Sequence, residues 1–369
     1  MGSRTRRLEA RVAGLLGKAH GVFVNSGSSA LELGMGLLGL PPGSELLTPP
    51  LTFSTTVASQ VRAGYVPAFV DVAPGTFVID VEQAASMIGP RTRGMVVPNL
   101  IGNVPDWDAL RALADRHDLV LFEDSCDVLG ARLRGRPPGA RADISVASFN
   151  ESHLITCLGT GGLVAFDDPA RDEEARLLRN WGRSSSRHGS GPLDFPGSLE
   201  TEVDGIPYHR DFVFERLGFN WEGSEVQAAF GLAQLDRLDA FLAQHRAHHA
   251  AHTRCFGAHE AWFQLPRQLP EVETGWMSYP LVVRPEAPFD RNDVLRHLER
   301  ERIGSRPIWS GNLLRHPGFR DIPHRARPQG YPVSDDVMRG GLLLPAHHGL
   351  GARDIGRIHE AMARFLSRY

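Results

Sequence analysis

His153, a residue type that can carry protons near neutral pH, lies in a short polar segment of this chain. The segment begins Ser148-Phe149-Asn150-Glu151-Ser152-His153 and is closed by the glycine-rich run 159–162. Strand-like runs flank it at 143–147 and 163–166. A strand, a polar turn, glycines and a second strand predict a loop that points a side chain into a cleft.

A second segment combines glycine and serine at the start of a helix. Asn25-Ser26-Gly27-Ser28-Ser29 follows the strand-like run 22–24 and opens a helix that is rich in leucine and glycine. A strand that turns into a helix through small residues presents free backbone N–H groups to an anion. Serine and glycine also cap helices that bind nothing, so phosphate binding and simple capping both stay open here.

Two carboxylates follow a buried-looking strand. Asp124 comes two places after the end of the apolar run 119–122, and Asp127 lies three places further on. A carboxylate at the end of such a run either caps a helix or pairs with a buried cation. Phe53, which follows another strand-like run at 45–49, has core packing as its simplest interpretation.

Strand-like and helix-like segments alternate over residues 20–165. This alternation predicts an α/β fold with a mostly parallel sheet and helices on both faces. No G-x-G-x-x-G follows a strand, so a dinucleotide-binding fold is not supported. Ligands of such sheets gather beyond the carboxyl ends of the strands. The segment 26–29, Phe53, Asp124 and His153 all follow strands and are therefore expected to converge on one crevice.

The chain changes character near residue 239. Residues 224–242 predict one long helix, and strand, helix and strand patterns at 278–283, 291–302 and 304–308 predict a small α+β domain. We therefore expect a large domain at 1–238 and a small one at 239–369.

Four histidines lie at helical spacing near the start of the small domain: His245, His248, His249 and His252. No carboxylate or cysteine completes a metal-ligand set with them, so the favoured interpretation is a solvated helix face rather than a metal site.

Bulk properties exclude several classes of protein. The net charge of −3 and the absence of a basic stripe argue against nucleic acid as a partner. No apolar run is long enough for a membrane span, and the Arg-rich N-terminus lacks a secretory core. The three cysteines, Cys126, Cys157 and Cys255, have neither metal-site nor disulfide spacing. A cytoplasmic protein is the expectation.

The segment that carries His153 strongly resembles the cofactor loop of the sugar aminotransferases of the DegT/DnrJ/StrS family. In that family, the residue five places after the serine that matches Ser148 is a lysine, which forms an imine with pyridoxal phosphate (PLP). Here that place is taken by His153, and the only lysine of the chain, Lys18, is far away in sequence. The resemblance runs from about residue 8 to residue 365. It implies the α/β architecture of fold-type-I PLP enzymes, with a seven-stranded type of sheet in the large domain and a homodimeric assembly.

The resemblance also implies roles for residues that the pattern singled out. Gly27, Ser28 and Ser29 match the phosphate cup of the family. Phe53 matches an aromatic ring that stacks on the pyridine of the cofactor. Asp124 matches the carboxylate that faces the pyridine nitrogen, where it preserves the ring as an electron sink.

Three further positions are assigned by the same resemblance. Ser148 belongs to the cofactor-binding set. Asp127 stands where many family aminotransferases have glutamine, and an acidic residue there is typical of the dehydratase branch. Asn220 matches an asparagine that reaches the phosphate in the neighbouring subunit.

A histidine in place of the lysine is the mark of the 3-dehydratases of ascarylose and colitose synthesis, which use pyridoxamine phosphate (PMP) on 4-keto-6-deoxy nucleotide sugars. The resemblance therefore implies a cofactor, PMP or PLP, that is bound without a covalent link. It implies His153 as the base for the loss of the C3 hydroxyl.

On the substrate side, Arg306 and the pair Asn312 and Arg315 resemble a loop of these dehydratases. Fixed arginines suit the diphosphate of a sugar nucleotide, and ordinary surface charge is the alternative.

The ascarylose-type enzyme holds an iron–sulfur cluster through cysteines after a Trp-Gly-Arg motif. The matching run here, 181–189, has no cysteine. We therefore expect no metal, and a cluster-free cycle is favoured over one that needs a reductase partner. The run 159–162 and Leu154 also depart from the family pattern beside His153.

Two alternatives stay open from sequence. One is an aminotransferase-like or oxidative enzyme acting on a sugar, cyclitol or nucleoside. The other is a homologue that binds the cofactor without catalysis.

Overall fold

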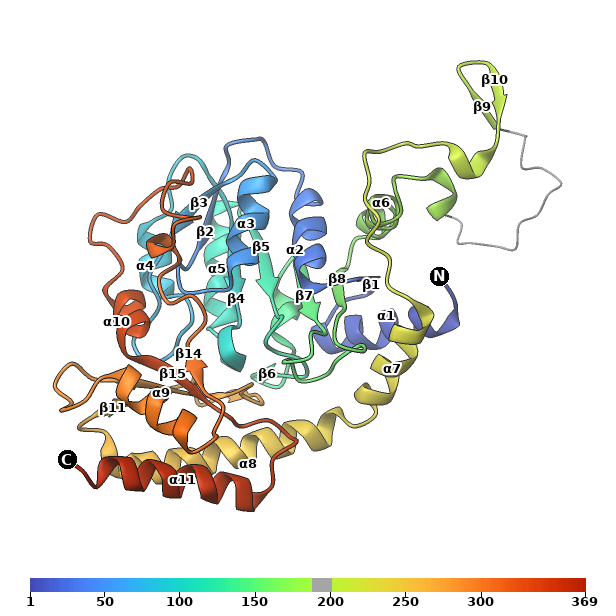
Figure 1. Cartoon of the computed structure of the whole chain (residues 1–369). Helices are drawn as coiled ribbons and strands as arrows, with labels where there is room; N and C mark the ends of the chain where they lie inside the picture. The colour runs from blue at the N-terminus through green and yellow to red at the C-terminus, as the bar shows by residue number, and fades with distance from the viewer. Residues whose placement is uncertain (188–200) are drawn as a thin grey trace.

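The computed structural model describes residues 1–187 and 201–369, and its centre is a seven-stranded sheet (Figure 1). The strand order is β1-β8-β7-β5-β4-β2-β3. The strands are β1 (His20–Val24), β2 (Glu45–Thr48), β3 (Val66–Phe69), β4 (Thr92–Pro98), β5 (Val120–Asp124), β7 (Ile144–Ser148) and β8 (Gly162–Phe166). Neighbouring pairs run parallel except where β8 pairs antiparallel with β1 and β7. The mostly parallel α/β sheet expected from the sequence is confirmed.

Helices cover both faces of this sheet, and each buries an apolar stripe. The helices of this part are α1 (Ser3–Leu16), α2 (Gly27–Gly36), α3 (Ser54–Arg62), α4 (Val81–Ser86), α5 (Trp107–His117) and α6 (Pro169–Arg179). On one face α5 packs Trp107 and Leu110 against the strands, and on the other α2 packs Leu31 and Leu33. Burial of this apolar surface is what holds the layers together.

The single antiparallel strand β8 has a direct consequence for the site. Because β8 returns beside β7, the connection 149–161 leaves and re-enters the sheet at one edge, beyond the carboxyl end of β7. The segment that carries His153 is therefore a hairpin loop over that edge. The expected strand–loop–strand arrangement is confirmed.

A second sheet, with the order β11-β13-β15-β14, belongs to the C-terminal part of the chain. Its strands are β11 (Phe263–Gln264), β13 (Tyr279–Val283), β14 (Arg306–Pro307) and β15 (Gly341–Leu344). It packs with α9 (Arg291–Arg300), α10 (Pro332–Gly340) and α11 (Ala352–Leu366). The long helix α8 (Leu238–Phe256) runs beneath this layer beside α11 (Figure 1). The domain boundary at 238/239 stays a prediction, and α8 begins at that point.

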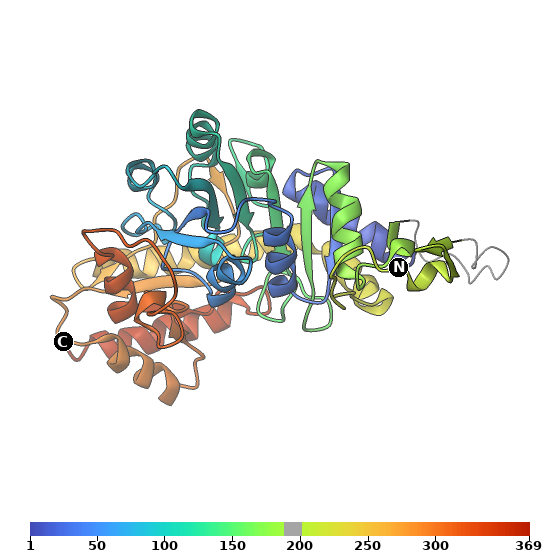
Figure 2. The ribbon, with the colours of Figure 1, turned by 90° about the horizontal axis from the view of Figure 1, so that it is seen from above.

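The single helix expected over 224–242 is wrong. The chain forms α7 (Glu225–Leu235), turns at Asp236 and Arg237, and then begins α8. The turn lets α7 pack on α1 while α8 continues under the small sheet. Before α7, the hairpin of β9 (Thr201–Val203) and β10 (Ile206–Tyr208) extends away from the sheet in both views (Figures 1 and 2). Residues 183–203 are rich in serine, glycine and proline, and this composition predicts an exposed loop. Most of that segment, residues 188–200, lies outside the described residues.

The solvated face expected for the four α8 histidines is also wrong. His245, His248 and His252 are buried against the small sheet, and their ring nitrogens contact the backbone carbonyls of Trp276, Ala346 and Pro345. Within the described part of the chain no group of three or more histidine, cysteine or acidic side chains is placed to hold a metal ion. These histidines are therefore packing residues of the interface between α8 and the small sheet.

This burial predicts acid sensitivity. Desolvation lowers the pKa of His245, His249 and His252 to about 4, from about 6.5 in an unfolded chain. The stability that the neutral rings contribute is therefore complete above about pH 6.5 and is lost as the pH falls through about 4.

His249, whose ring lies between Trp276 and Tyr279, gives the cleanest test. We expect His249→Phe to recover on the order of 1–3 kcal/mol of unfolding free energy at pH 4.5 and little at pH 8. Urea titrations at both pH values measure this, and equal changes at both would contradict it.

Candidate active site

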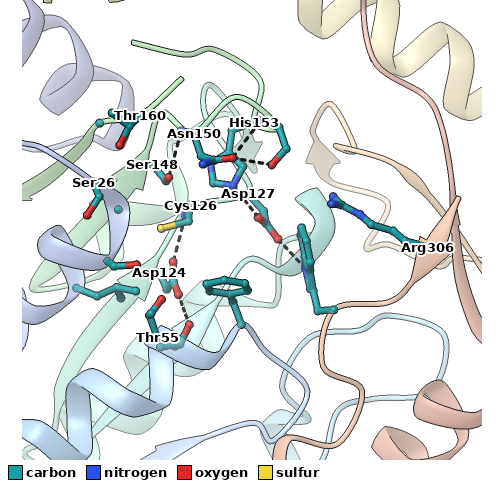
Figure 3. Close-up of a pocket in the computed structure, with 18 residues that line it drawn as sticks. Ser26, Thr55, Asp124, Cys126, Asp127, Ser148, Asn150, His153, Thr160 and Arg306 are labelled. Atoms are coloured by element: carbon teal, nitrogen blue, oxygen red, sulfur yellow. Dashed lines mark hydrogen bonds and ion pairs between the residues drawn. The ribbon is translucent and has the colours of Figure 1, made fainter. Parts of the chain in front are cut away.

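A cavity of about 370 Å³ lies beyond the carboxyl ends of β5 and β7 (Figure 3). It gathers most of the residues that the sequence singled out. Those in its wall are Gly27, Ser28, Phe53, Asp124, Asp127, Ser148, His153 and Arg306. Arg306 approaches from the side opposite to Ser26 and Thr160 (Figure 3). The strand ends bring these scattered positions together, as parallel sheets do.

Asp124 ends β5 and is buried at the base of the cavity. One carboxylate oxygen accepts the hydroxyl of Thr56 at 2.7 Å, and the other accepts the backbone N–H of Cys126 at 3.2 Å. These donors hold the carboxylate toward the cavity, where it can face a cationic ligand group. Thr56 was missed by the sequence reasoning. The feature that could have indicated Thr56 is its position one turn after Thr52, at the start of α3. The two hydroxyls are 3.1 Å apart in the structure.

The first turn of α2 forms another part of the wall. Ser26 caps the helix by accepting the backbone N–H of Ser29 at 3.0 Å. Gly27 touches the end of β7 so closely that an added Cβ would lie 2.5 Å from the Cβ of Ser148. Helix N-termini leave N–H groups without an intrahelical partner, and here they border the cavity beside a small residue. The arrangement fits a phosphate.

Contacts within the loop 149–161 hold it in place. Phe149 is buried in the core beneath it, and its carbonyl accepts the Thr156 hydroxyl at 3.0 Å. The same hydroxyl accepts the N–H of Gly159 at 2.8 Å, and Thr160 donates to the carbonyl of Asn25 at 2.7 Å. The last contact ties the loop to the helix start that would bind phosphate, so both parts of the site are positioned together.

Gly162 shows how tight this junction is. A Cβ at that position would lie 2.2 Å from the carbonyl oxygen of Ser26, which is backbone and cannot rotate away. We expect Gly162→Ala to lower the free energy of unfolding by about 1–3 kcal/mol, because overpacking forces backbone shifts. Thermal unfolding of the variant and the wild-type protein measures this loss of stability. Gly14→Ala, in the last turn of α1 with open space around its Cβ, is the control and should be neutral or stabilising. Equal melting temperatures for the two variants would contradict the argument.

The imidazole of His153 faces a second carboxylate. Its Nε2 lies 3.7 Å from Oδ1 of Asp127, and both side chains are largely buried. The other oxygen of Asp127 accepts the N–H of Ile101 at 2.8 Å and the indole N–H of Trp309 at 3.1 Å. Burial raises the pKa of Asp127, and the charge of His153 opposes that rise. Nδ1 of His153 is buried with no hydrogen-bond partner among the described residues. The ring therefore has one nitrogen that faces a carboxylate and one that is buried without a partner.

Aromatic rings close the cavity on the side of the small sheet. Phe53 and Trp309 pack edge to face with centroids 6.2 Å apart, and the guanidinium of Arg306 lies 4.8 Å from the centroid of Trp309. Phe53 remains 53% exposed, so its ring is available to a ligand and is not core packing. Trp309 was missed from sequence, and its signal was an aromatic residue three places after Arg306.

Four of the expected site residues lie outside this cavity wall. Ser29 donates its hydroxyl to Asn25 at 2.7 Å. Asn312 and Arg315 both contact the carboxylate of Asp335, at 2.8 Å and 2.5 Å, so neither is directed at the cavity. Asn220 is exposed on the segment before α7. Its predicted role concerns a neighbouring subunit and stays a prediction.

The only lysine of the chain, Lys18, lies at the opposite end of the sheet from this cavity. Lys18 precedes β1, is buried, and contacts the carbonyl of Ala142 and the carboxylate of Asp167, the latter at 3.0 Å. The cavity lies at the carboxyl ends of the parallel strands, so no lysine amine reaches it. The residues present fit pyridoxal or pyridoxamine phosphate held without a covalent bond: a helix start for the phosphate, an exposed ring at Phe53, and the Asp124 carboxylate for the pyridine nitrogen.

Comparison with known proteins agrees with this site. Residues 1–363 match the model of the DegT/DnrJ/EryC1/StrS aminotransferase family, and the chain belongs to this family. Its fold is the type I fold of PLP-dependent enzymes. In the described part of the chain, no helix is long and apolar enough to cross a membrane.

Some individual relatives are named as sugar 3-dehydratases, and others are named for different reactions. The dTDP-4-dehydro-2,6-dideoxy-D-glucose 3-dehydratase of Saccharopolyspora spinosa is 29% identical, covering 100% of this chain and 81% of that protein. The GDP-perosamine synthase of Caulobacter vibrioides is 30% identical, covering 97% of this chain and 89% of that one. The E. coli GDP-4-keto-6-deoxy-D-mannose-3-dehydratase, solved with hydrated PLP, superposes with a TM-score of 0.86 at 22% identity and covers 98% of this chain and 92% of its own. The family of this chain thus consists of PLP-dependent, sugar-modifying enzymes of more than one reaction type.

Proposed function

We propose that this protein is a dehydratase that uses pyridoxamine phosphate to remove the C3 hydroxyl of a 4-keto-6-deoxy sugar nucleotide in the cytoplasm. The observation that carries the proposal is His153. An imidazole stands in the cavity that fits the cofactor, while the only lysine lies at the opposite end of the sheet. The 3-dehydratase names of relatives from Saccharopolyspora spinosa and Yersinia pseudotuberculosis support the reaction type.

When bound, the cofactor supplies an amine that condenses with a ketone and a ring that accepts electrons. The residues of the chain then have separate tasks. Asp124 holds the ring nitrogen through a fixed negative charge. His153 moves a proton through its imidazole, which lines the cavity. Asp127, held by Trp309 and Ile101, keeps the imidazole ring oriented.

The competing reaction is transamination, which some relatives carry out by name. Dehydration removes an oxygen from the sugar, whereas transamination adds a nitrogen, so product mass separates them. The purified protein is mixed with pyridoxamine phosphate and a 4-keto-6-deoxy sugar nucleotide, and the product is analysed by mass spectrometry. A product that has lost the C3 oxygen supports the proposal, and an amino sugar overturns it.

A second measurement tests the non-covalent cofactor. Pyridoxal phosphate added to the protein should leave no adduct at the loop after borohydride reduction, because a lysine amine is needed for the reducible imine. Pyridoxamine phosphate should still bind and change the absorbance spectrum. A borohydride-fixed adduct on residues 148–162 would contradict the assignment.

We also propose a homodimer. The segment before and within α7 exposes large apolar side chains on a projecting part of the molecule, which is unusual for a free surface. They are Ile206, Tyr208, Phe212, Phe214, Leu217, Phe219 and Val226. Leu217 is 97% exposed, and Asn220 lies three residues beyond it. Sedimentation should show a dimer that Leu217→Asp weakens, and a monomeric wild-type protein would rule out the assembly.

A further inference from the structure

Trp309 connects the C-terminal part of the chain with the carboxylate beside His153. It follows β14, and its indole N–H donates to Oδ2 of Asp127 at 3.1 Å. Asp127 in turn lies beside His153 at the wall of the cavity (Figure 3). Within the described residues, the other hydrogen bond to this carboxylate comes from the backbone N–H of Ile101 at 2.8 Å. Trp309 is therefore the side chain that holds Asp127 from the small-sheet side.

The backbone of Trp309 is held in an unusual conformation. Its φ is 39°, in the left-handed region that favours glycine. The hydroxyl of Ser310 donates to the carbonyl of Thr52 at 2.6 Å, and the N–H of Leu313 donates to the carbonyl of Pro50 at 3.0 Å. A non-glycine residue keeps such a conformation only where the surrounding structure over-determines it, and such residues cluster at functional sites. The segment after β14 is thus fixed on the loop before α3, with the indole N–H directed at Asp127.

The ring of Trp309 is held independently of its N–H group. Phe53 packs edge to face against it with centroids 6.2 Å apart, and the guanidinium of Arg306 lies 4.8 Å from its centroid. Neither contact uses the indole nitrogen. A cation over an aromatic ring draws on its electrons, and polarisation of this kind strengthens a hydrogen-bond donor. A phenyl ring at this position could keep both ring contacts and would lose the hydrogen bond.

The two N–H donors act on the charge of Asp127. Burial raises the pKa of this carboxyl, and the charge of Asp124 raises it further. The charge of His153 and the hydrogen bonds from the backbone and the indole lower the same pKa. Cys126 is the other titratable side chain near this carboxyl, and burial raises the pKa of its thiol, which stays neutral. Both donors bind Oδ2, which leaves Oδ1 to face the imidazole at 3.7 Å.

We propose that Trp309 is a positioning residue for the base, and that its indole N–H keeps Asp127 charged and turned toward His153. This rests on the proposed function, because it takes His153 as the base. It goes further by making the charge beside the base depend on a residue of the part of the chain that forms the small sheet.

The first test is an NMR titration of the cofactor-free protein with carbon-13 at Cγ of aspartate. The signal of Asp127 is assigned by its absence in Asp127→Asn. Trp309→Phe keeps an aromatic ring and removes the N–H. We expect it to raise the proton affinity of Asp127 about 10-fold, which moves the midpoint about one pH unit higher, because a hydrogen bond to a charged group is lost. Trp262→Phe, the same substitution away from the cavity, is the matched control and should leave the midpoint unchanged.

The second test is single-turnover dehydration at saturating PMP and sugar nucleotide. Trp309→Phe should be about 10-fold slower than the wild-type protein, with an unchanged affinity for PMP, because the ring contacts persist. In an Asp127→Asn background the same change should slow the reaction less than about 2-fold, because the charge that the indole stabilises is already absent. A residue that only packs would slow the reaction equally in both backgrounds.

An unchanged midpoint of Asp127 in Trp309→Phe overturns the proposal, and so does a rate loss of equal size in both backgrounds. The NMR titration needs no turnover. If the midpoint moves as expected but even the wild-type protein forms no dehydrated product, the proposed function fails and the control of Asp127 by Trp309 stands. If product forms while Trp309→Phe changes neither the midpoint nor the rate, the positioning role fails and the function stands.

Discussion

Replacing His153 with asparagine is expected to slow dehydration by about 10²–10⁴-fold, the usual contribution of a positioned general base. Asparagine keeps a polar side chain of similar reach but cannot take up a proton. Pyridoxamine phosphate should still bind, because Asp124 and the start of α2 are unchanged. Single-turnover rates at saturating cofactor measure the chemical step, and the absorbance of the bound cofactor reports its occupancy.

The control for this change is His117→Asn, at the exposed C-terminal end of α5. It makes the same substitution far from the cavity and should leave the rate unchanged. If His153→Asn dehydrates as fast as the wild-type protein with the cofactor bound, another group is the base. Loss of the cofactor itself would instead show that the imidazole serves binding, which equally contradicts the assigned role.

Asp124→Asn is the second large effect, and we expect about 10²–10³-fold slower dehydration. The substitution preserves shape but removes the negative charge that would face the pyridine nitrogen. Fixed electrostatic partners of this kind typically contribute that much to a rate. Thr56 and the N–H of Cys126 lose a charged acceptor at the same time. The measurement is the single-turnover rate, together with a pH titration of the bound cofactor's absorbance.

In that titration the ring nitrogen should lose its proton at lower pH in the variant than in the wild-type protein. Asp115→Asn, on the exposed face of α5, is the matched control. An unchanged rate and an unchanged titration in Asp124→Asn would mean that this carboxylate does not face the ring. Its role would then be to hold the start of α3 through Thr56.

The local residue pattern was enough to predict the large sheet and the succession of strands and helices along the chain. Apolar runs of strand length ended at Asp124 and Ser148, and in a parallel sheet such ends share one edge. The presence of Gly27, Phe53, Asp124 and His153 in one cavity follows from that rule. The presence of His153 where the family has a lysine can likewise be recognised from the sequence alone, because it depends on residue type and not on packing.

Contacts between segments far apart in the chain decided the rest. Asn312 and Arg315 turn toward Asp335, about twenty residues later, and a loop sequence does not say which way its side chains face. The histidines of α8 share one helix face, and their spacing does not say whether that face is exposed or covered. In the structure the small sheet covers them, and backbone carbonyls accept their N–H groups. Trp309 enters the site because β14 pairs with β15, which places it beside Asp127. Residue type and period are local properties, whereas burial and partner choice are set by which surfaces meet when the chain closes on itself.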